Sequence, residues 1–534
     1  MPTQLTTCAK GRRSGRLKSN RFDKAIQLPT PCIPNTARLP KQQTDQVDYP
    51  KNRLSKMRNL TQGSPVKLIL LFSIPLLLGN LFQQLYTIVD SVVVGRLIGV
   101  DALAAVGATG KMAFLIIGFS WGATAGLTIP VARYFGADDI AGVKRSIVAS
   151  GVVAALVAFG ITAVGLIFGD ALLRLVNTPE NLLPMALAYQ RVMFGTAALT
   201  VAFNWLSAVI RAMGDSRTPL IFLIVSNVIN AGLSIFFVGT LGLGVAATAA
   251  TTAIAQAVSV VACLWYARRK MPQMFPNRVA VREGLRQLGE PARIGLPMGF
   301  QMSVIGIGTV VLQAAVNNLG PDAVAAATIS TRLEGIAMGP LNTFGIAMAT
   351  FVAQNYGAGQ FRRIRIGVLR MSLVSIVFAF AAGALQVIFT DQLVGIFTAD
   401  ASLPMLEMVR TQLRVSAVMY FTLGILFIVR NTIQGLGATA VPTIAGFVEL
   451  ALRSGAGIFL GAAFGWLGVA WGNPLAWAGA FALCGVSWLS HRQKLLAKEK
   501  SNTGFALLDS VDSADYVSES SVPVGVGARM AIAA

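Results

Sequence analysis

The stretch from Ser73 to Gly107, SIPLLLGNLFQQLYTIVDSVVVGRLIGVDALAAVG, holds the pattern that decides the fold. It is mostly apolar, and its first part is long enough for a helix to cross the hydrocarbon core of a bilayer, which takes roughly 20 residues. Similar apolar runs, separated by short loops that hold most of the charge, recur about twelve times along the chain. We therefore expect an all-α integral membrane protein with twelve transmembrane helices.

Composition and charge both favour a protein whose solvent is lipid. Of the 534 residues, 54% are hydrophobic and 13% are charged, and the mean hydropathy is +0.65, which is more apolar surface than one soluble core can bury. The net charge of +21 would also suit a nucleic-acid-binding protein. The basic residues, however, gather in the N-terminal segment and between the apolar runs, so we expect a lipid bilayer and no nucleic acid as partner.

The apolar runs predict the helices, and the charges between them predict their orientation. Lys and Arg gather in alternate connections, for example in the segment 268–293 and at Arg362, Arg363 and Arg365. Loops rich in these residues remain in the cytoplasm, which places both termini there. The predicted spans are 66–94, 102–131, 146–168, 185–209, 219–239, 245–267, 292–316, 323–353, 366–390, 407–431, 441–463 and 467–490.

An internal repeat relates the two halves of the chain at an offset of roughly 222 residues. Because an even number of spans separates the copies, both have the same orientation, and the pseudo-axis lies along the membrane normal. We predict two six-helix lobes that rock about a central cavity and expose it to either side in turn. The paired segments are 74–76 with 296–298, 100–105 with 321–326, 132–137 with 353–358, 243–246 with 467–470, and Pro219 with Pro442.

Changes in composition predict the boundaries of the segments. We expect a disordered basic N-terminal extension (1–63), a first lobe (64–267), a cytoplasmic linker (268–290), a second lobe (291–490) and a disordered cytoplasmic tail (491–534). The Arg-rich, acid-poor extension could suit an organelle transit peptide, although its serines are few. Equally, Met57 lies just before the first span and could be the start of translation. The sequence therefore leaves open whether residues 1–56 belong to the mature protein.

Metal and enzyme chemistry find no support in the sequence. Cys8, Cys32, Cys263 and Cys484 are scattered without a CxxC pattern, and His491 is the single histidine. The predicted spans contain no HExxH motif, no paired acids and no Ser-His arrangement of the kind that an intramembrane enzyme needs. We predict no metal site, no cofactor other than a coupling ion, and no enzymatic activity.

The opening stretch, the loops RYFGADD and QNYGAGQ after the second and eighth spans, and the twin-lobe repeat together resemble multidrug and toxic compound extrusion (MATE) transporters over residues 57–495. The resemblance implies a V-shaped pair of six-helix bundles. It also implies multidrug efflux of cationic or amphipathic small molecules by antiport against protons or sodium ions. The expected setting is the bacterial inner membrane, which is the plasma membrane, with the protein acting as a monomer.

Asp90 is the first candidate for ion coupling. Gln83, Tyr86, Thr87 and Asp90 are spaced by 3 and 4 residues and share one face of the first predicted helix. A carboxylate in hydrocarbon is costly and is a functional hypothesis by default. Because no basic residue lies one turn away, we expect the Asp90 carboxylate either to take up and release protons or to coordinate sodium. The alternative is an acid at the helix end, beside water.

Polar residues on the fifth and sixth spans can complete a site with that carboxylate. Asn227, Asn230 and Ser234 form one stripe, and Thr252 and Gln256 form another. The resemblance assigns Asn230 and Thr252 to the family's ion site, but Ser234 stands where many members have a second Asp, which favours protons over sodium. The alternative is that these side chains only join neighbouring helices.

The second lobe offers weaker candidates. Ile305 stands where some sodium-coupled members carry Glu, which favours an ion site in the first lobe. Glu334 could hold a protonatable or substrate site, and Arg332 is close to it in sequence. Glu449 lies four residues before Arg453, the order of a self-neutralising structural pair.

Two other classes of function remain as alternatives. A lipid-linked oligosaccharide flippase of the same broad superfamily would line its cavity with several bases for the diphosphate. The lobes hold few, chiefly Lys111 and Arg332. An intramembrane enzyme is the other alternative, but the predicted spans contain none of the motifs that such an enzyme needs. The sequence does not name the exported compounds, settle proton against sodium coupling, or give the oligomeric state.

Overall fold

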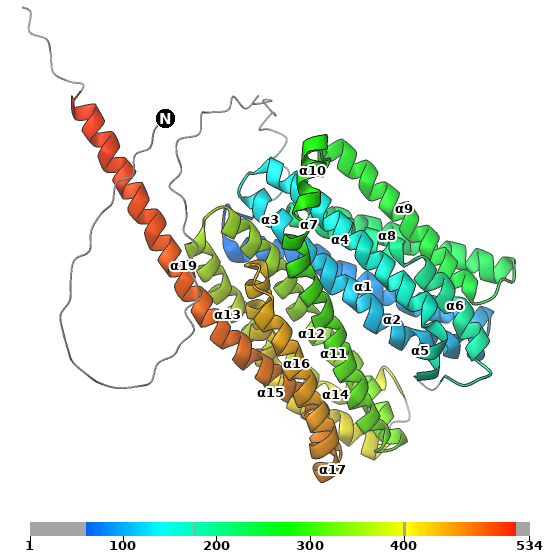
Figure 1. The fold of residues 1–534 in the computed structure, drawn as a ribbon. Coiled ribbons are helices and arrows are strands. Elements are labelled where there is room, and N and C mark those ends of the chain that lie inside the picture. Colours follow the sequence, from blue (N-terminus) through cyan, green and yellow to red (C-terminus); the bar gives the residue numbers. More distant parts are fainter. Residues whose placement is uncertain (1–59, 176–177, 399–401, 520–534) are drawn as a thin grey trace, which may run out of the picture. The chain divides into compact units, whose positions relative to one another are not determined.

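The computed structural model describes residues 60–175, 178–398 and 402–519, and these form helices joined by short turns (Figure 1). The described part of the chain contains no β-strand. The first half comprises α1 (Pro65–Leu97), α2 (Val100–Leu127), α3 (Ile129–Gly136), α4 (Ile140–Ile167), α5 (Gly169–Leu175), α6 (Leu183–Gly195), α7 (Ala197–Ala212), α8 (Arg217–Ser234) and α9 (Ala246–Lys270). We call these helices the N-lobe.

A short 3₁₀ turn (Pro272–Met274) and α10 (Arg278–Arg286) connect the N-lobe to the second half. That half, the C-lobe, comprises α11 (Gly289–Asn317), α12 (Pro321–Gly357), α13 (Phe361–Ile388), α14 (Thr390–Gly395), α15 (Leu403–Gly435), α16 (Ala440–Gly455), α17 (Gly461–Phe464), α18 (Trp466–Ala470) and α19 (Gly472–Glu519). One π-helical turn follows α8 (Ile235–Thr240) and another follows α16 (Ala456–Leu460), so the two lobes break from α-helix at corresponding places.

The helices agree with the predicted spans. Within the described residues, ten helices are long and apolar enough to cross a membrane, and α6 and α7, bent by 44° at their junction, form one further broken span. The 28-residue α2 occupies the place of the second predicted span. Since each predicted apolar run is covered by a helix or a bent pair, the all-α membrane fold is confirmed.

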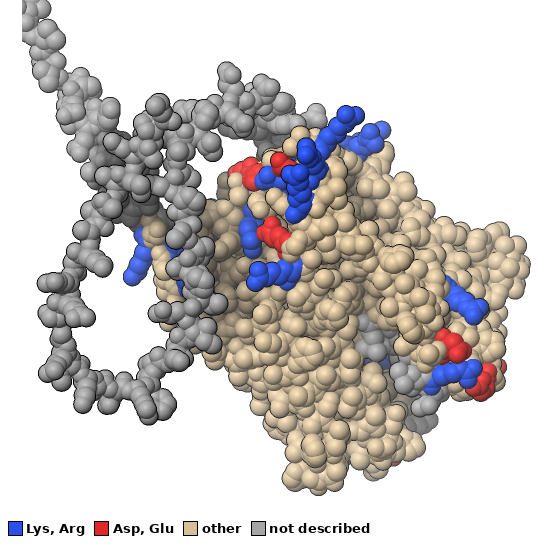
Figure 2. Space-filling view, in the orientation of Figure 1, with Lys and Arg blue, Asp and Glu red and all other residues tan. Residues whose placement is uncertain are grey.

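One end of the helices is marked by the start of α1, the turn between α3 and α4, and α10, which packs on α4. We call it the linker end, and the opposite end, where α1 finishes and α12 begins, the distal end. Figure 2 shows Lys, Arg, Asp and Glu gathered over the linker end and around α5 at the distal end. Most of the visible surface between them is uncharged. That band is the surface a bilayer would cover.

The segment before α1 is fixed to the C-lobe at the linker end. The Leu60 N–H donates to Gln354 Oε1 (3.1 Å), and the Leu60 carbonyl accepts from Asn355 Nδ2 (3.2 Å) and Arg363 Nη2 (3.2 Å). Arg363 Nη1 donates to the Gly63 carbonyl. The Leu60 side chain is fully buried. We call this set of contacts the interlobe clasp.

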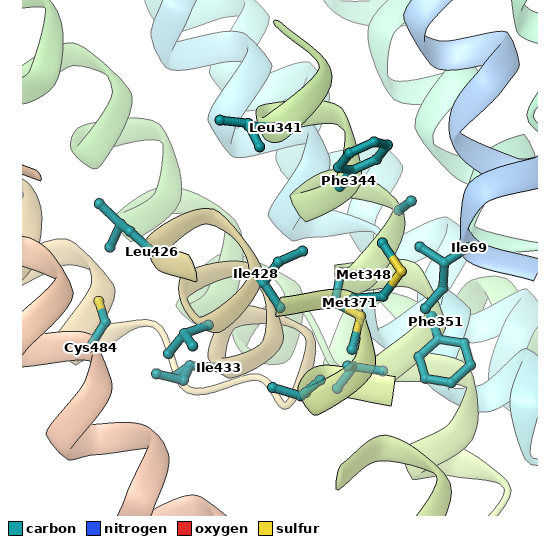
Figure 3. Packing of buried hydrophobic residues seen from close by; sticks show 14 of the residues in the cluster. Ile69, Leu341, Phe344, Met348, Phe351, Met371, Leu426, Ile428, Ile433 and Cys484 are labelled. Carbon is teal, nitrogen blue, oxygen red and sulfur yellow. The ribbon is translucent and has the colours of Figure 1, made fainter. Parts of the chain in front are cut away.

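The apolar core of the C-lobe continues into this junction. Ile69 and Phe72 of α1 belong to a buried cluster whose other members come mainly from α12, α13, α15 and α19. Figure 3 shows Ile69 beside Met348 and Phe351 of α12. The two lobes therefore share a hydrophobic core at the linker end.

Glycines allow α2 and α11 to touch across the lobe boundary. A Cβ atom at Gly126 would lie 2.7 Å from the Gly295 Cα, and one at Gly299 would lie 2.9 Å from the Phe119 carbonyl oxygen. Both are closer than a real Cβ contact, so only glycine fits at these two positions. The lobes thus pack backbone to backbone there, as small residues permit within membranes.

The C-terminal helix is longer than predicted. α19 continues to Glu519, past residue 491, where we expected a disordered tail to begin. Lys498 donates to the Tyr356 hydroxyl (2.6 Å), and Arg365 is ion-paired with Glu499. These contacts bind the helix to α12 and α13 after the apolar run has ended. The predicted N-terminal extension lies outside the described residues, except for its last four, 60–63.

Candidate ion-coupling site

Three helices of the N-lobe bring the polar candidates together: α8 packs against both α1 and α9. Asp215, just before α8, fixes the start of this group because it accepts from the Thr218 N–H (3.1 Å), the Thr218 hydroxyl (2.6 Å) and the Tyr266 hydroxyl of α9 (3.0 Å). Capping of a helix start by a carboxylate is typical. It sets α8 in register with α9.

The predicted stripes meet in one chain of hydrogen bonds. Thr252 Oγ1 accepts from Asn230 Nδ2 (2.8 Å) and lies 3.1 Å from the Tyr86 hydroxyl, which joins α9 to both α8 and α1. Ser234 Oγ donates to Asn230 Oδ1 (3.4 Å) and pairs with Thr251 Oγ1 (2.8 Å). Asn230 and Ser234 are buried. Four of the predicted residues therefore form a single polar cluster.

Asp90 lies one turn beyond Tyr86 on α1 and is partly buried. Its Oδ1 is inaccessible to solvent, and none of the described residues donates a hydrogen bond to it. No described Lys or Arg forms an ion pair with it. Asp90 interacts electrostatically with Tyr86 and with Tyr189 of α6. This carboxylate lies one turn along α1 from Tyr86 of the cluster and keeps an acceptor oxygen without a hydrogen-bond donor among the described residues.

The remaining N-lobe candidates lie at the edges of the cluster. Asn227 Nδ2 reaches the Phe82 carbonyl at 3.5 Å, and Gln256 Oε1 accepts from the Thr200 hydroxyl of α7 (2.6 Å). The Gln83 carbonyl accepts from Thr87 within α1. Asn227 and Gln256 therefore join neighbouring helices, which is the alternative the sequence left open for them.

Glu334 belongs to a separate site in the C-lobe. It is 3% exposed, and its Oε1 accepts from Gln412 Nε2 (2.8 Å) and Ser416 Oγ (2.5 Å), both on α15. Arg453 of α16 acts on it electrostatically. Arg332, its neighbour in sequence, forms no ion pair among the described residues. Glu334 is therefore held by neutral donors and one more distant base.

The second buried acid, Glu449, has the partner that the sequence predicted and a closer one that it missed. Its Oε2 lies 4.0 Å from Arg453 Nη2, and its Oε1 is ion-paired with Arg430 of α15. All three side chains are at most 7% exposed. Arg430 lies inside the predicted span 407–431, and this position was the sequence signal that could have identified it as a partner of Glu449. Together with Glu334 the group balances two acids against two bases.

The oxygen atoms of the N-lobe cluster suit the binding of a proton better than the coordination of a metal cation. Sodium, like other hard cations, needs several oxygen ligands. Here the hydroxyl of Thr252 is already bonded to Asn230 and to the Thr248 carbonyl (3.0 Å), and Ser234 is bonded to Asn230 and Thr251. A proton needs one acceptor, and Asp90 Oδ1 supplies it.

Comparison with known proteins gives a consistent set of relatives. A family model described as MatE matches residues 75–236 and 297–455, one range in each lobe, beginning at positions that the predicted repeat pairs. The chain is 30% identical over 311 residues to the probable multidrug resistance protein YpnP of Bacillus subtilis (strain 168), which covers 58% of this chain and 69% of the relative. It is 25% identical over 428 residues to the multidrug export protein MepA of Staphylococcus saprophyticus, covering 78% of this chain and 91% of the relative.

Solved structures share the fold. A crystal structure of a MATE protein in complex with MaL6 superposes with a TM-score of 0.74 at 24% identity, covering 83% of this chain and 99% of that one. An outward-facing conformation of a multidrug resistance MATE transporter superposes with a TM-score of 0.71 at 23% identity, covering 82% and 98%. At this identity the likeness concerns the fold alone.

Proposed function

We propose, because this chain belongs to the multidrug and toxic compound extrusion family, that it exports cationic or amphipathic small molecules by antiport against protons, and that Asp90 carries the coupling proton. The chain is a multi-pass membrane protein of a transporter family whose relatives include proteins named for multidrug resistance and export. The antiport, the substrate class and the role of Asp90 form the proposal. The observation that carries it is the buried Asp90 oxygen, which has no described hydrogen-bond donor.

We infer that the linker end faces the cytoplasm and that the described state is closed there. Bases in alternate connections favour this orientation for a bacterial plasma membrane. The interlobe clasp, the contact of Gly126 with Gly295, and the bond from Asn80 Nδ2 to Thr343 Oγ1 (3.2 Å) all lie between the linker end and the middle of the helices. No interlobe side-chain hydrogen bond among the described residues lies nearer the distal end. Such an arrangement suits a transporter open to the outside.

One chain suffices for this cycle. Both lobes, the boundary between them and the whole polar cluster come from the same polypeptide. We therefore propose that the protein works as a monomer. Alternating access then follows from motion of the lobes about their shared contacts.

A lipid-linked oligosaccharide flippase is less well supported. Binding of a diphosphate calls for basic side chains that are free to turn toward it. Arg430 and Arg453, the buried bases of the C-lobe, are already engaged with Glu449. Arg332 is exposed and forms no ion pair among the described residues, but one free base falls short of the several that a diphosphate calls for. The Lys111 side chain lies outside the described part of the structure.

The test is a dye-driven proton flux in sodium-free proteoliposomes. We expect ethidium to dissipate a preset pH gradient with the wild type and not with Asp90→Asn, because an amide cannot release a proton. Asp170→Asn is a matched control, since Asp170 is exposed, pairs with Arg174 and forms no hydrogen bond with the cluster among the described residues. Equal dissipation by wild type and Asp90→Asn would show that Asp90 is structural. A response that begins only when sodium is added would contradict proton coupling.

A further inference from the structure

A basic pocket of about 490 Å³ lies at the linker end of the C-lobe, beside the interlobe clasp. Its lining includes Arg362, Arg363 and Arg370 of α13, the apolar Phe361 and Ile366, and Pro65 at the start of α1. We refer to it as the basic pocket. Neither ion coupling nor drug export has a use for it.

Two of the three arginines are unengaged. Arg363 donates hydrogen bonds to the Leu60 and Gly63 carbonyls of the clasp. Glu499, the one acid in the lining, is ion-paired with Arg365, which offsets its charge. Arg362 and Arg370 are exposed, and neither has an ion pair or a side-chain hydrogen bond with any residue in the described ranges. The pocket therefore offers two free guanidinium groups to an anion.

The placement of these groups on α13 matches a lipid boundary. Arg362, Ile366 and Arg370 follow one another at intervals of one turn, so Arg370 lies about 12 Å deeper along the helix than Arg362. Next to this face runs an apolar stripe of side chains that are more than half exposed, formed by Leu369 (64%), Leu373 (55%) and Val377 (70%). Arginines above exposed apolar surface are typical of the level of the headgroups.

We propose that the basic pocket binds the phosphate of an anionic phospholipid, with Arg362 and Arg370 contacting the phosphate and the acyl chains lying along Leu369, Leu373 and Val377. Guanidinium groups recognise phosphate through paired, charge-assisted hydrogen bonds. Pockets with bases at the cytoplasmic end of transmembrane helices are suited to lipid headgroups. A soluble phosphate would use the arginines but gain nothing from the apolar stripe.

The site adjoins the contact that holds the lobes together. Arg363 lines the pocket and at the same time donates to the clasp carbonyls, so a bound headgroup rests against the side chain that fastens the segment before α1. Because a ligand that binds the folded state stabilises it, an anionic lipid should raise the thermal stability of the closed linker end.

The experiment uses the full-length protein in detergent, titrated with dioleoyl phosphatidylglycerol, dioleoyl phosphatidylcholine or glycerol 3-phosphate, with lipid adducts counted by native mass spectrometry. The site variant is Arg362→Gln with Arg370→Gln. The matched control is Arg278→Gln with Arg282→Gln, which removes the same charge from exposed positions of α10 outside the pocket. The ratio of the two lipid affinities is measured within each protein, so a general loss of folding does not imitate the effect.

We expect wild type and control to prefer phosphatidylglycerol over phosphatidylcholine, and the site variant to lose roughly tenfold or more of that preference, given the attraction of each basic residue for an anionic surface. The melting temperature should rise with phosphatidylglycerol only where the preference is retained. An unchanged preference in the site variant would overturn the proposal. So would glycerol 3-phosphate that binds as tightly as the lipid and displaces it, since the pocket would then be a site for soluble anions.

Discussion

Asp90 and Glu449 are both carboxylates within membrane-crossing helices, and their surroundings give them different roles. Glu449 lies between Arg430 and Arg453, so its charge is matched inside the C-lobe. Asp90 has no such base among the described residues and keeps one buried oxygen without a donor. A buried charge that is paired often adds little to the stability of the folded protein, although removing its partner is costly. An unpaired charge in a membrane helix points to function. We therefore expect a structural role for the C-lobe group and keep the N-lobe group as the proposed site of ion coupling.

Removing the Glu449 charge should destabilise the protein strongly. Glu449→Gln leaves Arg430 and Arg453 with Glu334 as the one remaining acid of the group, and loss of one partner of a buried pair costs about 3–5 kcal/mol. Glu407→Gln is the control, because Glu407 pairs with Arg410 at the surface, where its side chain is 60% exposed. Surface pairs contribute about 0–1 kcal/mol. Thermal unfolding in detergent should show a clear fall in melting temperature for Glu449→Gln and almost none for the control; equal shifts would contradict a structural role for Glu449.

Part of the site could be predicted from residue types and spacing alone. The spacing placed Tyr86, Asn230 and Ser234, and Thr252 in polar stripes on three helices, because residues three and four apart share a helix face, and the structure joins these side chains by hydrogen bonds. Which faces of different helices meet is a property of tertiary packing, so Thr251 was missed. For the same reason Arg430 was not identified as the partner of Glu449, since α15 and α16 are separate helices.

At the scale of elements, α2 and α11 pack backbone to backbone across the lobe boundary, and this contact depends on a few glycines. A methyl group at Gly126 meets the Gly295 backbone at 2.7 Å, and backbone cannot move aside as a flexible side chain can. The two helices would have to separate. Because the interlobe clasp lies at the same end, loosening of this pair should weaken the whole junction.

Gly126→Ala should therefore lower the melting temperature and slow transport. Gly118→Ala on the same helix is the matched control, because a Cβ atom there meets nothing within 4 Å. In a helix interior alanine is preferred over glycine by about 0.5–1 kcal/mol, so the control should be neutral or slightly stabilised. If Gly126→Ala behaves like Gly118→Ala, the α2–α11 contact is not needed for the closed state.

The helices themselves were largely predictable, because the length of an apolar run is set by the thickness of the bilayer. The bends and irregular turns within these helices were not predictable from the sequence. The 44° bend between α6 and α7 and the π-helical turns after α8 and α16 leave hydropathy unchanged. The extension of α19 past residue 491 was missed because its residues are polar, and the contacts of Lys498 and Glu499 with the C-lobe are tertiary.

At the scale of the whole molecule, the proposed cycle requires the linker end to open. The described state holds it shut through contacts that run from the interlobe clasp to the bond between Asn80 and Thr343. Other contacts add to it: Arg133 donates to the Leu436 carbonyl (3.2 Å), and Gln354 Nε2 donates to the Ala212 carbonyl (2.8 Å). Opening toward the cytoplasm must break several of these at once.

A reversible cross-link tests this requirement. In a cysteine-free background, Asn80→Cys with Thr343→Cys joined by a short thiol-specific linker should stop dye export, and reduction should restore it. The control pair is Asp322→Cys with Ser402→Cys, whose side chains also touch (3.1 Å) but lie within the C-lobe at the distal end. Cross-linking of the control should leave export intact. Full export by the cross-linked Asn80–Thr343 protein would show that this contact need not open during the cycle.

The interlobe clasp also has a consequence for how the protein is made. Leu60 forms hydrogen bonds with partners 294, 295 and 303 residues further along the chain. At a synthesis rate of about 5–20 residues per second, those partners leave the ribosome roughly 15–60 s after Leu60. During that interval α1 is in the membrane while the segment before it has nothing to bind, and a holding chaperone or an early protease would find its target there. The interlobe clasp thus joins one of the first described residues to be synthesised to helices that are made much later.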